Sequence, residues 1–169
     1  GFSGKESETK VFPVFGTPLK KVILLGRGDK QKWHRRKALL LPRRMVQAGK
    51  QERIKTIATE LTLLELGDDA HASARDIAIN ALMAHFEFTK YKQPSTNGKS
   101  GINALSLAVD NSQLKTACHG ISIGIIIGEE INSCRELANT PGGDMTPALL
   151  AHAAVQTAKK TGLKATIFD

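Results

Sequence analysis

The chain has 169 residues and a formal net charge of +8 at pH 7. Hydrophobic residues make up 41% and charged residues 24%, which is typical of a folded globular protein and excludes a disordered or collagen-like chain. Two cysteines, Cys118 and Cys134, are too few for a disulfide framework and are typical of a reducing compartment. The most apolar run, residues 121–127, is much shorter than the roughly 20 residues that span a membrane, so we expect no membrane partner.

The first part of the chain predicts a strand followed by helical structure. Residues 21–25 (KVILL) are apolar and end at Gly26 and Gly28, which indicates a buried strand. Residues 31–49 then have the pattern of a helix, with Gly49 as its end. Pro42 lies inside this segment, and a proline in a helix interior costs about 3 kcal/mol. We therefore expect either a kink at Pro42 or two short helices that meet there.

The middle of the chain alternates between strand and helix patterns. Residues 53–66 favour a strand in their first half, although Ile54, Ile57, Leu61 and Leu64 also fit helical spacing. Residues 67–69 form a turn, and the apolar positions in residues 70–88 predict a helix. Residues 93–101 (QPSTNGKSG) have the composition of a loop, and residues 103–109 (NALSLAV) predict a second strand.

Residues 113–139 carry conflicting signals. Their isoleucines favour a strand, whereas their length and lack of proline favour a helix. Gly120, Gly124 and Gly128 recur every four residues, which on a helix forms a smooth stripe that another backbone can approach closely. We predict a long buried helix here.

The last segment has clear helix boundaries. Thr146 is placed as the N-cap, Pro147 as the first helical residue and Gly162 as the residue that follows the helix. Residues 163–168 (LKATIF) predict a strand, so the chain alternates strand and helix and belongs to the α/β class. Because the sequence stops on a strand that directly follows a helix, we expect a truncated βα unit.

Positive charge is concentrated in one segment, residues 20–55. This segment has a net charge of +11, whereas the remainder of the chain has a net charge of −3. Such a concentration fits an anionic partner, nucleic acid above all, but a solvated helix face explains it as well, and we favour that explanation because no nucleic-acid motif accompanies the charge. The thirteen bases are Lys20, Lys21, Arg27, Lys30, Lys32, Arg35, Arg36, Lys37, Arg43, Arg44, Lys50, Arg53 and Lys55.

Motifs that would carry chemistry are incomplete. Gly26 and Gly28 open a dinucleotide fingerprint, but Gln31 stands where its third glycine belongs, so we expect a turn at the end of a strand. Residues 98–100 (GKS) end like a phosphate-binding loop, but Gln93 stands where the pattern needs a glycine. No HExxH pair occurs among the five histidines, which are His34, His71, His85, His119 and His152.

The two cysteines do not complete a site either. On one continuous helix, Cys118 and Cys134 are about 24 Å apart, which excludes both a disulfide and a shared metal. We expect two ordinary thiols, buried or half-buried. The sequence therefore assigns no catalytic, cofactor-binding or metal-ligating residue.

Residues 135–151 (RELANTPGGDMTPALLA) closely resemble a junction of the leucyl aminopeptidase family, peptidase family M17. In that family, a segment of the form AR(D/E)LxNTPxNxxTPxxLA closes a connecting helix and opens the catalytic domain. Residues 86–92 resemble its Y-x-F-x-x-Y-K element, and residues 21–28 resemble its VxLxGLG strand with Arg27 in place of leucine. The resemblance extends from about residue 11 to residue 169, and it departs from the family at Pro42 and at residues 142–144.

The resemblance implies part of a cytoplasmic, hexameric metalloprotease that removes N-terminal amino acids, often leucine, from peptides. In the family, two divalent metals, zinc or manganese, bridge the attacking hydroxide, and all their ligands lie in the C-terminal domain. The motifs that carry those ligands, NTDAEGRL among them, are absent from this chain. The resemblance thus implies a non-catalytic fragment with a scaffold and oligomerisation role.

The resemblance also implies a domain organisation. Residues 1–112 would form a macro-domain-like, three-layer α/β N-terminal domain, residues 113–140 a linker helix, and residues 141–169 the incomplete start of the catalytic domain. Two alternatives stay open. One is a nucleic-acid-binding module that uses residues 20–55, as some bacterial members of the family bind DNA. The other is a macro-domain-like binder of a nucleotide diphosphate.

Overall fold

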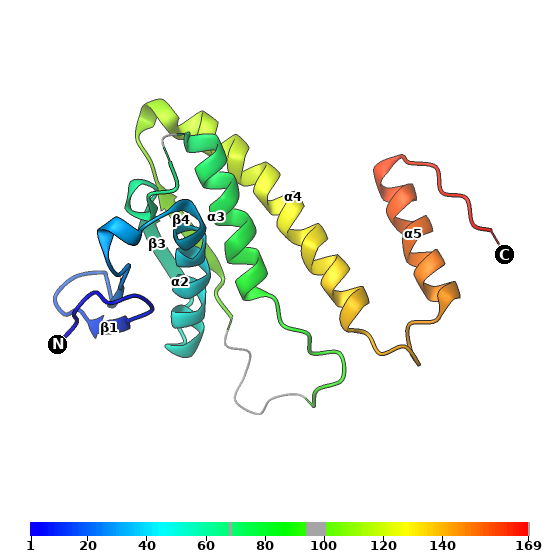
Figure 1. Cartoon of the computed structure of the whole chain (residues 1–169), viewed down its shortest axis with the longest axis horizontal. Coiled ribbons are helices and arrows are strands. Elements are labelled where there is room, and N and C mark those ends of the chain that lie inside the picture. The colour runs from blue at the N-terminus through cyan, green and yellow to red at the C-terminus, as the bar shows by residue number, and fades with distance from the viewer. Residues whose placement is uncertain (68, 94–100, 169) are drawn as a thin grey trace. The chain divides into compact units, whose positions relative to one another are not determined.

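The computed structural model describes residues 1–67, 69–93 and 101–168 (Figure 1). Short 3₁₀ turns lie at Lys30–Lys32, Thr62–Leu64 and Asn111–Gln113. The strands and helices are β1 (Thr9–Pro13), β2 (Lys21–Leu25), α1 (Arg35–Ala38), α2 (Leu40–Gln51), β3 (Thr56–Glu60), α3 (Ala70–His85), β4 (Ala104–Ala108), α4 (Leu114–Asn139) and α5 (Pro147–Thr161).

The chain divides into two compact units, Gly1–Glu130 and Ile131–Asp169. The first unit contains the four strands, α1 to α3 and most of α4, and the second contains the last turns of α4 together with α5. None of the described helices is long and apolar enough to cross a membrane.

The four strands form two separate pairs. β1 and β2 are antiparallel, with Val11 opposite Ile23, and β3 and β4 are parallel, with Ala58 opposite Ser106. The parallel pair is joined through α3, as parallel strands require a long crossover. The strands predicted at residues 21–25, in the first half of 53–66 and within 103–109 are confirmed.

A cleft of about 630 Å³ is lined by both strand pairs. All five residues of β2 contribute to it, together with Thr56–Thr59 of β3. Its wall is mainly aliphatic and includes Val22, Leu24 and Ile57. Among the described strands, β2 is hydrogen-bonded only to β1 and β3 only to β4, so the edges of β2 and β3 that face this cleft are unpaired.

Pro42 is accommodated where two helices meet. α1 ends at Ala38, Leu39 follows, and Pro42 is the third residue of α2. In the first turn of a helix the backbone N–H has no intrahelical acceptor, so proline removes nothing there. Of the two arrangements expected at Pro42, the structure has the two-helix one. The predicted end at Gly49 is wrong, because α2 continues to Gln51.

Gly49 has a packing role instead of a terminating one. A Cβ atom at this position would lie 2.6 Å from Ile57 Cδ1 on β3 and 2.8 Å from Ile102 Cδ1. The missing side chain therefore lets α2 lie against the parallel pair.

The core of the first unit lies between α1, α2, α3 and the segment after β3. Its buried side chains are Ala38, Leu41, Leu61, Leu64, Leu66, Ala70 and Ile77. Asp69 caps α3, since its carboxylate accepts hydrogen bonds from the backbone N–H groups of His71 and Ala72. α3 ends at His85, three residues earlier than predicted, because Phe86 adopts an extended conformation.

α4 is a helix as predicted, but it is not a buried one. Its buried residues are Ala117, Gly120, Gly124 and Gly128, which lie along one stripe. Ile125, Ile126 and Ile127 are 40%, 59% and 37% exposed. The helix was predicted to be buried from its composition, but within the first unit only the side that carries the glycine stripe is buried.

The second unit confirms the predicted helix boundaries but not the predicted strand. The Thr146 hydroxyl accepts from the Leu149 N–H, Pro147 opens α5, and Gly162 follows it with φ 74°. Residues 163–168 have no regular structure, so the strand predicted there is wrong. A strand requires a hydrogen-bonded neighbour, and no described residue pairs with this segment. Residues 94–100 of the predicted loop, with the GKS triplet, lie outside the described residues.

Candidate functional site

The basic segment, residues 20–55, is the strongest candidate binding surface in the sequence, and the structure shows which groups its basic side chains contact. Eight of its thirteen bases contact a partner within the chain: Lys21, Arg27, Arg35, Lys37, Arg43, Arg44, Lys50 and Lys55. Lys21 pairs with Glu52 at 2.7 Å and Lys37 with Glu6 at 2.7 Å. Most of the segment's bases therefore contact groups within the chain, although pairs as exposed as Lys21–Glu52 add little stability.

Arg44 joins α2 to the N-terminal hairpin. Its guanidinium donates to the carbonyl oxygens of Gly26 and Glu8, each at 2.7 Å. Burial lowers the pKa of Arg44, and the charge of Glu6 partly offsets this effect. The guanidinium thus satisfies one backbone acceptor directly after β2 and one directly before β1, which is a structural use of a basic side chain.

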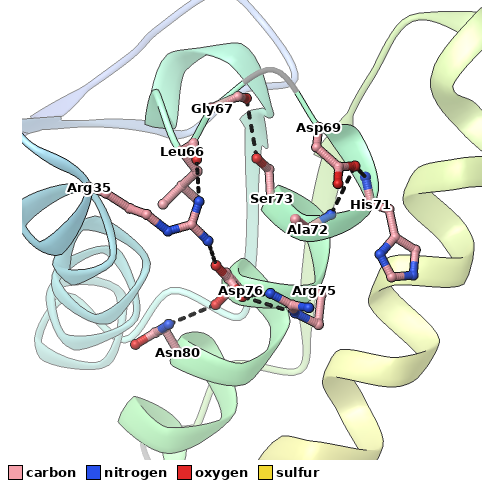
Figure 2. Close-up of polar contacts among 10 residues, drawn as sticks. All are labelled: Arg35, Leu66, Gly67, Asp69, His71, Ala72, Ser73, Arg75, Asp76 and Asn80. Carbon is pink, nitrogen blue, oxygen red and sulfur yellow. Dashed lines mark hydrogen bonds and ion pairs between the residues drawn. The ribbon is translucent and has the colours of Figure 1, made fainter.

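A polar network connects α1 with α3 and the segment before α3 (Figure 2). Arg35 donates to the Leu66 carbonyl oxygen at 2.9 Å and forms an ion pair with Asp76. The Asp76 side chain is only 12% exposed, and it also accepts from Arg75 Nε at 3.1 Å and Nη2 at 2.9 Å. A carboxylate this far removed from water requires such partners, so the two arginines compensate its burial.

Asn80 extends this network to α2. Its side-chain amide donates to the Asp76 carbonyl oxygen at 2.8 Å, and its amide oxygen accepts from Arg43 Nε at 2.7 Å. Arg43 and Arg35 thus reach α3 from two different helices. The sequence offered no signal for this network, because Arg35 and Arg43 are 31 to 41 residues away in the chain from the groups they contact, and the members form no motif.

Five bases of the segment have no partner among the described residues, and all five are exposed: Lys20, Lys30, Lys32, Arg36 and Arg53. They belong to several elements, the 3₁₀ turn, α1 and the ends of β2 and α2 among them. They are the bases that a polyanion would meet first.

The Gly26–Gly28 turn is covered by the start of the chain. The Gly28 N–H donates to the Gly4 carbonyl oxygen at 2.9 Å, and the Gly26 N–H donates to that of Glu8 at 2.7 Å. A Cβ at Gly26 would lie 2.0 Å from the Lys5 carbonyl oxygen. These glycines therefore admit a neighbouring backbone at a strand end. The strand ends before Gly26 as predicted, but residues 26–29 have no regular structure, so the turn predicted there is not observed.

The glycine stripe of α4 is a packing surface against α3. A Cβ at Gly120 would lie 2.2 Å from the His71 carbonyl oxygen, and one at Gly124 would lie 2.5 Å from that of Arg75. A Cβ at Gly128 would lie 2.8 Å from Leu82 Cδ1. The α3 backbone is thus the nearest neighbour of Gly120 and Gly124, which are one turn apart, and the Leu82 side chain is the nearest neighbour of Gly128.

The histidines and cysteines form no metal centre of three or more ligands within the described parts of the chain. His85 Nε2 accepts from the Ile102 N–H at 3.2 Å, and His152 is hydrogen-bonded to Gln156 at 3.2 Å. Cys118 and Cys134 are free, as expected, but both are exposed, so the expectation of buried or half-buried thiols is wrong.

Comparison with known proteins decides the family. The profile described as "Cytosol aminopeptidase family, N-terminal domain" matches residues 1–95 of the chain. The chain belongs to the cytosol aminopeptidase family. The resemblance based on residues 135–151 is therefore confirmed by a match that lies in a different part of the chain.

Relatives in the family extend the match over the whole chain. A probable cytosol aminopeptidase of Aquifex aeolicus is 29% identical over 172 residues, which cover 99% of this chain and 32% of the relative. One from Persephonella marina is 28% identical, with 99% and 34% covered. The chain thus spans about a third of the length of these relatives.

Solved structures show the same fold. The bottromycin maturation enzyme BotP in complex with Mn matches 96% of this chain and 32% of its own, with a TM-score of 0.71 and 19% identity. A mutant of tomato leucine aminopeptidase matches 95% and 31%, with a TM-score of 0.69 and 23% identity. The chain therefore has the mixed α/β fold of the N-terminal part of M17 aminopeptidases.

Proposed function

We propose that this chain is the N-terminal portion of a cytoplasmic leucyl aminopeptidase and that it acts as a scaffold, without catalytic residues of its own. The observation that carries the proposal is the pattern of coverage: the relatives align over nearly all of this chain but over only a third of themselves. In such an enzyme, two divalent metals, zinc or manganese, would hydrolyse the N-terminal peptide bond in the remaining two thirds of the protein.

The surface of α4 supports a scaffold role. Ile126 is exposed on the side of α4 opposite its contact with α3, and Ile125 and Ile127 flank it, also partly exposed. Large apolar side chains gathered on one helix are typical of a surface that contacts protein. We infer that α4 contacts the rest of the aminopeptidase, and that the family's hexamer is built in part on the N-terminal unit.

The proposal includes a domain organisation. Residues 1–112 form a macro-domain-like, three-layer N-terminal domain, residues 113–140 the linker helix, and residues 141–169 the start of the catalytic domain. The continuous course of α4 through this linker and the helix α5 beyond it support that division.

A chimera tests the proposal. The first third of the Aquifex aeolicus relative is replaced by this chain, and hydrolysis of leucine p-nitroanilide is measured with added zinc or manganese. We expect the chimera to be active and hexameric by sedimentation, and this chain alone to be inactive. The catalytic part alone is the control, and we expect it to assemble poorly.

Two outcomes would contradict the proposal. Chelator-sensitive turnover by this chain alone, surviving repurification, would overturn its non-catalytic role. A folded chimera with the mass of a monomer would overturn its role in assembly.

A further inference from the structure

His71 on α3 and His119 on α4 lie next to each other across the helix contact. Their ring centroids are 5.0 Å apart, and the ring planes are inclined by 52°. Figure 2 shows the His71 ring directed away from the Arg35–Asp76 network and toward α4. His71 is half-buried and His119 is exposed, so water and small ions reach the pair.

The backbones that carry the two histidines are held firmly. The His71 N–H donates to the Asp69 carboxylate at 2.8 Å. Gly120, the neighbour of His119, brings α4 so close that a Cβ there would lie 2.2 Å from the His71 carbonyl oxygen. The positions of the two backbones from which the imidazoles extend are therefore set by a contact between the helices.

We propose that His71 and His119 form a binding site for a borderline divalent transition metal such as Zn²⁺, Ni²⁺ or Cu²⁺. A tetrahedral ion that binds each imidazole nitrogen at about 2.0–2.1 Å places two ring centroids about 5 Å apart, which is the separation observed. Imidazole is a preferred ligand of these ions and a poor one for Mg²⁺ or Ca²⁺.

The surroundings of the pair define the character of the site. Groups of three or more metal-ligating side chains are absent from the described residues, so water completes the coordination. The Asp69 carboxylate at the start of α3 offsets the positive end of the helix, which would otherwise oppose a cation. The site is therefore open and exchangeable, and it joins α3 to α4.

Metal binding would stabilise the fold, because the paired geometry exists only in the folded state. At a metal concentration of about one hundred times Kd, binding to the folded state alone raises Tm by roughly 5–10 °C for a chain of this size. The experiment is a titration of the whole chain with ZnCl₂, with MgCl₂ as the control ion. It is followed by Tm and by the imidazole NMR signals of the five histidines.

We expect the signals of His71 and His119 to shift together along one saturating curve, while those of the other three histidines stay in place. Removing a group that merely hydrogen-bonds to a metal ligand weakens metal binding about 10–100-fold. Removing a ligand itself, in His71→Gln or His119→Gln, should therefore weaken binding by about tenfold or more. The matched control is His152→Gln, which changes an exposed histidine on α5 and should leave binding unchanged.

The variant Cys118→Ser separates this site from one that uses the neighbouring exposed thiol. Retained zinc binding supports the histidine pair, whereas loss of binding in Cys118→Ser with retention in His71→Gln overturns it. Independent shifts of the two histidine signals, or no shift at all, show a contact between rings only and also overturn the proposal.

Discussion

Gly120→Ala tests the α3–α4 contact most directly. The new Cβ would lie 2.2 Å from the His71 carbonyl oxygen and 3.1 Å from its Cα, and a backbone carbonyl cannot rotate away as a side chain can. Overpacking of this kind typically costs 1–3 kcal/mol, and the better helix propensity of alanine returns up to about 1 kcal/mol. Because the obstacle is backbone, we expect the upper half of that cost and therefore a net loss of about 1–2 kcal/mol, or roughly 2–8 °C in Tm for a chain of this size.

The assay is urea and thermal unfolding followed by circular dichroism. Gly128→Ala is the graded comparison, because its Cβ would meet the movable end of Leu82 at 2.8 Å, so a smaller loss is expected. Ser122→Ala is the matched control on the exposed side of α4, where we expect a change within about 0.5 kcal/mol. If Gly120→Ala is as stable as the parent chain, α4 does not pack on α3 through its glycines and the reasoning fails.

Three further predictions concern the charged residues. Arg35→Gln removes a partner of the poorly exposed Asp76 carboxylate, and because Arg35 itself is half-exposed we expect the free energy of unfolding in urea to fall by about 1 kcal/mol. The control Arg36→Gln should lower it by less than about 0.5 kcal/mol, and equal losses would contradict a stabilising role of the Arg35–Asp76 pair. The hydrogen bond from Lys50 lowers the pKa of Glu87 below 4.5, so its stabilisation is present above the unfolded pKa and is lost as pH falls through the folded one. Lys50→Met should therefore flatten the stability–pH curve on the acid side of pH 4.5, and an unchanged curve would refute this. Binding to two unrelated DNA duplexes should be weak, equal and abolished by salt. It should fall, with the Tm unchanged, when glutamine replaces the five bases that have no partner among the described residues, Lys20, Lys30, Lys32, Arg36 and Arg53. Salt-resistant preference for one duplex would instead favour a nucleic-acid module.

The partners of the basic residues change how such a charge count should be interpreted. The net charge of +11 over residues 20–55 suggests a surface for polyanions. Arg35, Arg43 and Arg44, however, donate to groups on other elements that are distant in sequence, so replacing them would disturb the fold together with any binding. Variants of the five bases that contact no other side chain or backbone group in the described parts of the chain separate the two effects.

Local signals in the sequence were sufficient wherever a structure depends on its own neighbours. The strand at residues 21–25, the cap at Thr146, the proline at residue 147 and the glycine at residue 162 all act within a few residues of themselves, and each was confirmed. The junction string at residues 135–151 indicated the family for a similar reason, since its information is carried by consecutive residues.

Tertiary structure decided the features that depend on distant partners. Gly49 looked like a helix end, but it is a contact with β3. Residues 163–168 have strand-forming side chains, but none of the described strands pairs with them. The isoleucines of α4 predicted a buried helix, yet only the glycine stripe is covered in the first unit. Burial, charge pairing and strand pairing each require a second element, and the composition of one segment cannot specify which element packs against it or pairs with it.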